Sequence, residues 1–132
     1  VEKLASNYKY VVLDNEAGME HISRRTNGNL DVLLLVSDPS LKGIRTCKKL
    51  EDLVNKLGLN IKKLYLIMNR VENGVPSPLM EELGKLKLNL LGILPEDKNI
   101  IDYELNGIPM LNLEEDSLSV IKLNELMGKI FS

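Results

Sequence analysis

The first residues that could do chemistry are Asp14, which directly follows an apolar run at residues 10–13, and Gly18, four positions later. An aspartate at the end of a buried strand can hold a magnesium ion, usually through water, because Mg²⁺ keeps much of its hydration shell. A glycine at this place lets backbone amides approach a terminal phosphate closely. The alternative interpretation is structural, with Asp14 capping the next helix and Gly18 making a turn. The segment alone leaves both interpretations open.

Two further polar segments follow apolar runs later in the chain. Asn69 and Arg70 end one run, and an asparagine amide carries the donor and acceptor that match the N6 and N7 edge of adenine. Pro95, Glu96 and Asp97 end the next run, where the proline either walls a base pocket or simply ends a strand. Asn69 and Arg70 have a structural alternative too, since such a pair also caps loops.

Apolar runs must position these residues. Each run is continuous rather than alternating, which is typical of strands buried on both faces of a parallel sheet. The four runs are residues 10–13, 32–36, 64–68 and 90–94. Ligands bind at the carboxyl ends of such strands. The sequence therefore predicts one polar rim, made of residues 14–18, 37–39, 69–70 and 95–97.

Segments with helical periodicity lie between the runs. Residues 41–57 carry one apolar stripe, formed by Leu41, Ile44, Cys47, Leu50, Val54 and Leu57. Asp38-Pro39 and Ser77-Pro78 predict helix starts, because the polar side chain can cap free amides and proline suits the first helical position. The alternation of strands and helices predicts an α/β fold with right-handed crossovers and a doubly wound parallel sheet.

Two more helices are expected towards the C-terminus. One begins near Asp97 and carries Ile100, Ile101 and Leu105. The other begins near Asp116 or Ser117, and we expect it to bury Val120, Leu123, Met127 and Ile130.

Composition excludes several classes of function. The chain has 132 residues, enough for one domain, and 17 lysines and arginines against 19 acidic residues. This near-balance gives no electrostatic reason to expect nucleic acid or an anionic membrane as a partner. The only cysteine is Cys47, so no internal disulfide is expected and a cytoplasmic, reducing environment fits best. No apolar run approaches the roughly 20 residues of a membrane span.

The string from Asp14 to Thr26 carries a family resemblance: it reads Asp-Asn-Glu-Ala-Gly-Met-Glu-His-Ile-Ser-Arg-Arg-Thr. This string resembles the accessory ATPases of carbon monoxide dehydrogenase, the CooC type, which are grouped with septum-site, plasmid-partition and nitrogenase iron-protein ATPases. Residues 34–40, 43–45, 69–71 and 92–97 continue the match in order. The resemblance implies the C-terminal portion of a P-loop NTPase fold of the SIMIBI type.

The resemblance also implies roles for the first rim segment. Asp14 resembles the Walker B aspartate that helps to place magnesium, and it would be catalytic together with the switch that senses the terminal phosphate. Glu16, Ala17 and Gly18 resemble that switch. Glu20 and His21 match family positions, but their chemistry assigns them no role.

The later rim segments resemble the base-binding part of the family. Asn69 and Arg70 look like its base-contacting pair. Pro95, Glu96 and Asp97 would close the other side of the adenine, so that ATP or ADP would be the cofactor together with magnesium.

Two motifs of the resembled family are absent from the sequence. The phosphate loop Gly-x-x-x-x-Gly-Lys-Ser/Thr does not occur, since the pairs Gly84-Lys85 and Gly128-Lys129 are followed by leucine and isoleucine. The Cys-x-Cys metal motif is absent too. Both would precede Val1 in an intact member, and residues 2–7 look like the end of a helix.

We therefore expect residues 1–132 to form a single partial P-loop domain without its phosphate-binding loop. On its own, such a domain is expected to be inactive in ATP hydrolysis. The missing strand would leave an apolar sheet edge. We expect the chain to close its sheet differently or to associate with another copy.

Three functions compete. The first is a dimeric ATPase that inserts nickel into carbon monoxide dehydrogenase, its partner, with this chain supplying the base pocket and the switch but no nickel ligand. The second is a non-enzymatic interaction module with the same fold. The third is a partition or septum-type ATPase, which the ending at residues 122–132 disfavours because it lacks a basic face. His21, the only histidine, has no cysteine near it in sequence to complete a metal site.

Overall fold

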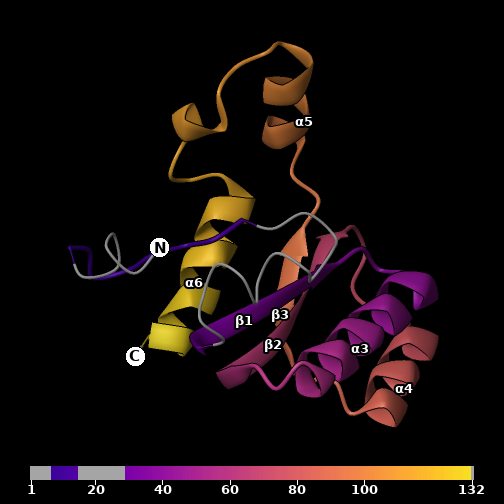
Figure 1. Ribbon diagram of the computed structural model, residues 1–132. Coiled ribbons are helices and arrows are strands. Elements are labelled where there is room, and N and C mark those ends of the chain that lie inside the picture. The colour runs from indigo at the N-terminus through magenta and orange to yellow at the C-terminus, as the bar shows by residue number, and fades with distance from the viewer. Residues whose placement is uncertain (1–6, 15–28, 132) are drawn as a thin grey trace.

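The computed structural model describes residues 7–14 and 29–131, in which strands and helices alternate (Figure 1). The strands are β1 (Asn29–Ser37), β2 (Asn60–Val71) and β3 (Leu90–Pro95), and they form a parallel sheet in the order β1-β2-β3. The helices are α3 (Leu41–Lys56), α4 (Ser77–Leu86), α5 (Lys98–Leu105), the short 3₁₀ helix η1 (Met110–Asn112) and α6 (Leu118–Phe131). This arrangement confirms the predicted α/β parallel sheet.

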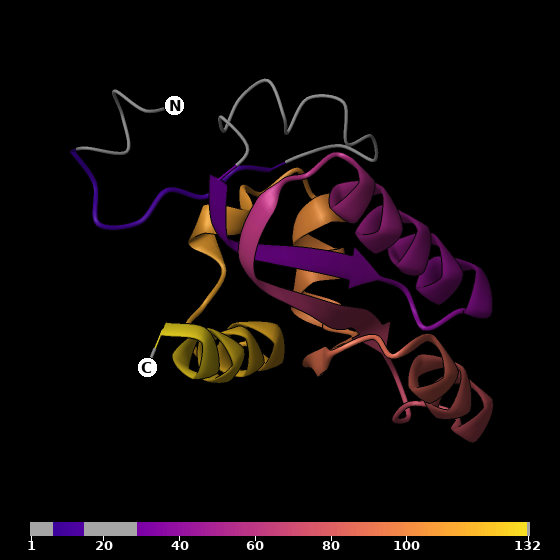
Figure 2. The same cartoon turned by 60° about the horizontal axis from the view of Figure 1, so that its bottom comes forward.

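Helices cover both faces of the sheet. The views agree that α3 and α4 pack on one face and α6 on the other (Figures 1 and 2). The main core lies between the sheet and the first two helices, and its buried members are Leu35, Ile44, Cys47, Leu66, Met68, Val71, Leu79, Leu83 and Leu88. Burial raises the pKa of the Cys47 thiol, as expected for a cysteine that serves as a small core residue. None of the helices in residues 29–131 is long and apolar enough to cross a bilayer.

The first apolar run, residues 10–13, is not a strand, and this prediction was wrong. Tyr10, Val11 and Val12 are exposed, the last of them at 91%. An apolar β-branched run forms a strand only where a neighbouring strand offers hydrogen bonds and a surface to pack on. Here the ring of Tyr10 instead packs against that of Phe131 in α6, with centroids 5.0 Å apart.

No described strand pairs with the outer edge of β1, so within the described residues the sheet ends there. Val36, near the carboxyl end of β1, is exposed. Both expectations, a different closure of the sheet and the association of two copies, stay predictions. An open strand edge favours pairing with another chain.

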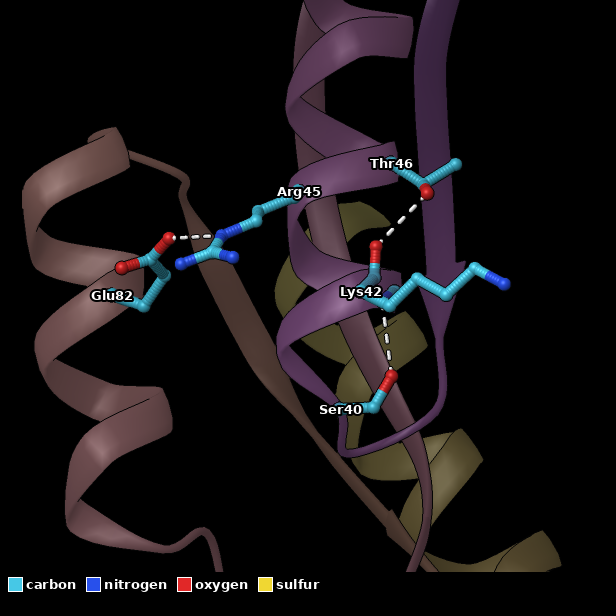
Figure 3. A network of polar contacts seen from close by, with 6 residues as sticks. Ser40, Lys42, Arg45, Thr46 and Glu82 are labelled. Carbon is cyan, nitrogen blue, oxygen red and sulfur yellow. Dashed lines mark hydrogen bonds and ion pairs between the residues drawn. The ribbon is translucent and has the colours of Figure 1, made fainter.

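The start of α3 is capped by Ser40, two residues after the predicted capping residue Asp38. The Ser40 hydroxyl accepts a hydrogen bond from the Gly43 amide at 3.0 Å (Figure 3). It also donates one to Asp38 Oδ1 at 2.8 Å. Asp38 therefore orients the capping residue instead of capping. A Cβ at position 43, in the first turn of α3, would lie 2.3 Å from Asp38 Oδ1 and from Ser37 Oγ, so these two side chains would have to move to make room for it.

The start of α4 also differs in detail from the prediction. Pro76 is the capping position, and no side chain caps the helix, although Pro78 lies in its first turn as expected. An ion pair between Arg45 Nε and Glu82 Oε1, 2.7 Å long, joins α3 to α4 (Figure 3). Because Arg45 is largely exposed, the pair contributes at most about 1 kcal/mol.

The buried face of α6 is displaced from the predicted one. Leu126 is fully buried and Leu123 is exposed, whereas Ile130 is buried as expected. The reason is Gly92 in β3, which leaves room for the Leu126 side chain to approach the strand: a Cβ at position 92 would lie 2.5 Å from Leu126 Cδ2. The glycine thus selects which leucine of α6 enters the core.

Candidate functional site

A bulge distorts β2 at its carboxyl end, at Asn69 and Arg70. The ladder to β3 shifts register between Met68 and Val71. Arg70 has a φ of 59°, in the left-handed region that non-glycine residues seldom adopt. Bulges of this kind re-aim side chains and are frequent next to functional sites. Strain of this size, about 1 kcal/mol or more, persists only where the surroundings fix it.

The bulge opens onto a pocket of about 310 Å³. Segments from two strands and two helices line it: Asn69, Arg70, Pro95, Glu96, Asp97, Ile100, Ile101, Glu104 and Ser119. The carboxyl ends of β2 and β3 are adjacent in the sheet, which brings together two rim segments that lie far apart in the sequence. The structure therefore places all five residues of the expected base-binding set around one pocket.

Asn69 offers polar atoms to this pocket. Its Oδ1 accepts a hydrogen bond from the Arg70 backbone amide at 3.0 Å. Its Nδ2 group makes no hydrogen bond to any residue of the described ranges, so it is available as a donor. One lone pair of Oδ1 also remains available as an acceptor.

Glu96 lies exposed at the rim of the pocket beside another carboxyl group. A hydrogen bond with the Glu72 carboxyl raises the pKa of Glu96, and the Arg70 guanidinium opposes that shift. The rim is therefore acidic, with a single guanidinium from the bulge facing it.

Asp97 is buried, and its hydrogen bonds join the segments that line the pocket. Its carboxylate caps α5 by accepting a hydrogen bond from the Asn99 amide at 3.0 Å. It also accepts one from the Ser119 amide at 2.9 Å and a short one from the Ser117 hydroxyl, both at the start of α6. These bonds, led by that from Ser117, lower the pKa of Asp97. Its carboxylate is engaged within the chain, so Asp97 shapes the pocket by joining β3, α5 and α6.

Sequence reasoning missed four lining residues: Ile100, Ile101 and Glu104 from α5 and Ser119 from α6. The two isoleucines were predicted on a helix but not at the site. One signal could have found them, because a helix capped by Asp97 directly after a strand must place its first turn at the same rim.

The first rim segment is only partly described. Asp14 is exposed and does not line the pocket. Glu16, Gly18, Glu20 and His21 lie outside the described residues. Among residues 7–14 and 29–131, no group of three or more His, Cys, Asp or Glu side chains is arranged to hold a metal ion.

A second depression of about 190 Å³ lies at the amino ends of β1 and β2. An exposed ion pair between Lys62 and Asp31, 2.6 Å long, lies in its lining. It is smaller and lies at the edge of the sheet opposite to the one where ligands bind in parallel α/β folds. The pocket at the β2 bulge is therefore the candidate site.

The fold is that of the MinD and ParA P-loop ATPases. A ParA family ATPase from Chlorobium tepidum superposes with a TM-score of 0.73 at 22% identity, over 98% of this chain and 52% of that one. MinD from Aquifex aeolicus superposes with a TM-score of 0.70 at 24% identity, over 96% of this chain and 56% of that one. At these identities the likeness establishes the fold.

Proteins with similar sequences show the family to which the chain belongs. An uncharacterized ATP-binding protein of Methanocaldococcus jannaschii is 39% identical over 132 residues, all of this chain and 52% of that protein. The septum site-determining protein MinD of Helicobacter pylori is 28% identical over 89% of this chain and 47% of its own length. The M. jannaschii match shows that the chain belongs to a family of ATP-binding proteins. The fold and the weaker sequence matches support the superfamily of MinD- and ParA-type ATPases. No family model matches it.

The accessory protein CooC of Rhodospirillum rubrum is 29% identical over 83% of this chain and 41% of its own length. This match is no stronger than the one to MinD. The comparisons therefore support the superfamily and not the CooC type in particular. The chain spans about half the length of the curated relatives it matches.

Proposed function

We propose that the chain supplies the base-binding part and the switch of an ATP-hydrolysing protein of the MinD and ParA superfamily. The observation that carries this proposal is the meeting of Asn69-Arg70 with residues 95–97 in one pocket at the carboxyl edge of the parallel sheet. The M. jannaschii relative, described as ATP-binding, supports it. Residues 1–132 would then form one partial domain.

The lining of the pocket fits an adenine ring. Pro95, Ile100 and Ile101 offer apolar contact to the faces of a purine. Asn69 can donate from Nδ2 to the adenine N7 and accept at Oδ1 from the N6 amino group. A guanine, with an acceptor where adenine has its amino donor, would face the Asn69 oxygen unfavourably.

Magnesium and phosphate would be bound by the first rim segment. In this proposal Asp14 binds the ion through water, and Glu16 and Gly18 respond to the terminal phosphate. The sequence holds no phosphate loop. We propose that a segment outside this chain supplies that loop, since the relatives are about twice as long. The chain alone is then expected to bind nucleotides weakly and to hydrolyse none.

The proposal predicts that AMP and ADP bind the chain with equal, millimolar or weaker affinity, because the base contacts are present without the phosphate loop. Amide NMR titrations measure this. Shifts should centre on Asn69, Arg70 and residues 95–97, and GMP should produce smaller ones. Micromolar binding of ADP would contradict the predicted division of the site. Absence of any shift with AMP would favour the alternative of a non-enzymatic interaction module.

A second prediction uses the strain at the bulge. Arg70→Gly should raise the free energy of unfolding by roughly 0.5–1 kcal/mol, because glycine adopts a positive φ without steric cost. The same change should weaken AMP binding, since it removes the guanidinium at the pocket. Urea denaturation and the NMR titration measure the two effects.

The matched control is Lys87→Gly, at the other described non-glycine residue with positive φ, 56° at the end of α4. It should give the same gain in stability and leave AMP binding unchanged. If Arg70→Gly binds AMP as well as the parent chain does, the guanidinium has no part in base binding.

A narrower proposal is the maturation of carbon monoxide dehydrogenase by nickel insertion. Its support is the match to CooC and the string from Asp14 to Thr26. It requires a Cys-x-Cys pair and a phosphate loop in the coding region upstream of Val1, and carbon monoxide dehydrogenase as partner. Sequencing that region decides the matter: an open reading frame with the loop but without the cysteine pair would remove the nickel proposal and leave ATP binding untouched.

A further inference from the structure

Residues 98–116 form an arm that projects away from the sheet, made of α5, η1 and the segments around them (Figure 1). Neither α5 nor η1 has a buried residue. The arm is held internally by the Tyr103 hydroxyl, which donates to the Asn112 carbonyl at 3.2 Å. It is anchored to the rest of the fold by the hydrogen bonds of Asp97.

Large apolar side chains of the arm face solvent. Leu111 is 99% exposed and Leu105 79% exposed, and Ile101, Ile108 and Met110 are exposed as well. Leu118, the first residue of α6, extends this set beside the arm. Single exposed leucines are ordinary on protein surfaces, but a run of them on an unburied segment marks an interaction site.

The arm is also strongly acidic. Residues 98–116 hold five acidic residues but only one lysine or arginine, Lys98. Asp102, Glu104, Glu114, Glu115 and Asp116 are all exposed. The net charge of the whole chain is only −2, so the acidic charge is concentrated on this arm.

We propose that the arm is a docking surface for a partner segment that is both apolar and basic, such as an amphipathic helix with lysines or arginines beside its apolar face. The exposed leucines supply the area that is buried on docking. The surrounding carboxylates select a basic partner and speed its encounter. A second copy of the chain is a poor occupant, because two acidic arms would meet.

The test uses a fluorescent synthetic helical peptide with leucines on one face and lysines on the others, titrated with the 132-residue chain and followed by anisotropy. Binding should weaken as salt rises, because screening shortens the range of charge attraction to about 10 Å at 0.1 M salt. A peptide with glutamate in place of lysine should not bind.

The decisive variant is Leu105→Ser/Leu111→Ser. Both residues are exposed, so the fold should be unaffected, and the affinity for the lysine peptide should fall by roughly tenfold or more. Leu53→Ser/Leu57→Ser, at two exposed leucines at the end of α3, is the matched control and should bind as the parent chain does.

Three results would overturn the proposal. One is a lysine peptide that does not bind, and another is equal binding of the glutamate peptide. The third is light scattering that finds a dimer which the arm variant dissociates, because the occupant would then be a second copy. Circular dichroism and thermal melts check that every variant is folded.

Discussion

Asp97→Ala is expected to lower the free energy of unfolding by about 3 kcal/mol, because hydrogen bonds to a charged acceptor are among the stronger ones and their loss leaves buried donors unpaired. The Ser117 hydroxyl that faces this carboxylate is itself buried, with its residue 2% exposed. The amides of Asn99 and Ser119 lose the same acceptor. Urea denaturation at neutral pH measures the change. Asp116→Ala, at an exposed aspartate nearby, should change stability by no more than about 0.5 kcal/mol.

The lowered pKa of Asp97 should also make the stability of the fold depend on pH. The pKa of Asp97 lies below its ordinary value of 3.8, so its stabilisation is present above that value and is lost as the pH falls through the lower pKa of the folded state. The stability difference between the parent chain and Asp97→Asn should therefore shrink between neutral pH and acid. A difference that stays constant down to the acid range would show that the charge of Asp97 does not contribute.

Leu126→Ala is the second large effect, again about 3 kcal/mol, because it leaves a cavity where a fully buried leucine packs on β3. Gly92→Ala should cost roughly 1–3 kcal/mol, since its Cβ would lie 2.5 Å from Leu126 Cδ2 and the leucine would have to move.

The double variant Gly92→Ala/Leu126→Ala tests whether the two residues pack against each other, apart from the stability that each single substitution loses. The new methyl group at position 92 occupies space that the leucine has left, so the two costs should sum to more than the cost of the double variant. Thermal or urea unfolding of all four proteins gives the coupling. Strict additivity would mean that the glycine does not select the leucine.

The positions of β1, β2 and β3 along the chain could be predicted from the sequence, because continuous apolar runs between amphipathic helices are typical of buried parallel strands. The run at residues 10–13 has the same apolar composition, yet the prediction of a strand there was wrong. Composition does not tell whether a neighbouring strand is present to pair with. A similar limit applies to α6, where periodicity predicts a buried Leu123 and the structure buries Leu126. Helical periodicity gives the spacing of a stripe, but its rotation depends on the strand that the helix packs on, where Gly92 leaves room for Leu126.

The pocket was partly predictable. That Asn69-Arg70 and residues 95–97 lie on one edge follows from parallel strands alone. The left-handed backbone of Arg70 does not follow, since arginine has no local preference for it and only the register of two strands imposes it. The role of Asp97 as a link to α6 was also out of reach, because it depends on serines twenty residues away in sequence.

The central position of β2 bears on how the chain folds. Both ladders of the sheet use β2, and the pairing with β1 joins residues 31 positions apart. Closing a loop of that length costs conformational entropy before any hydrogen bond between the strands forms, so parallel pairing is slow. Neither outer strand can enter the sheet before β2 is extended. Mutations in β2 should therefore slow folding itself, whereas mutations in the projecting arm should leave the folding rate unchanged.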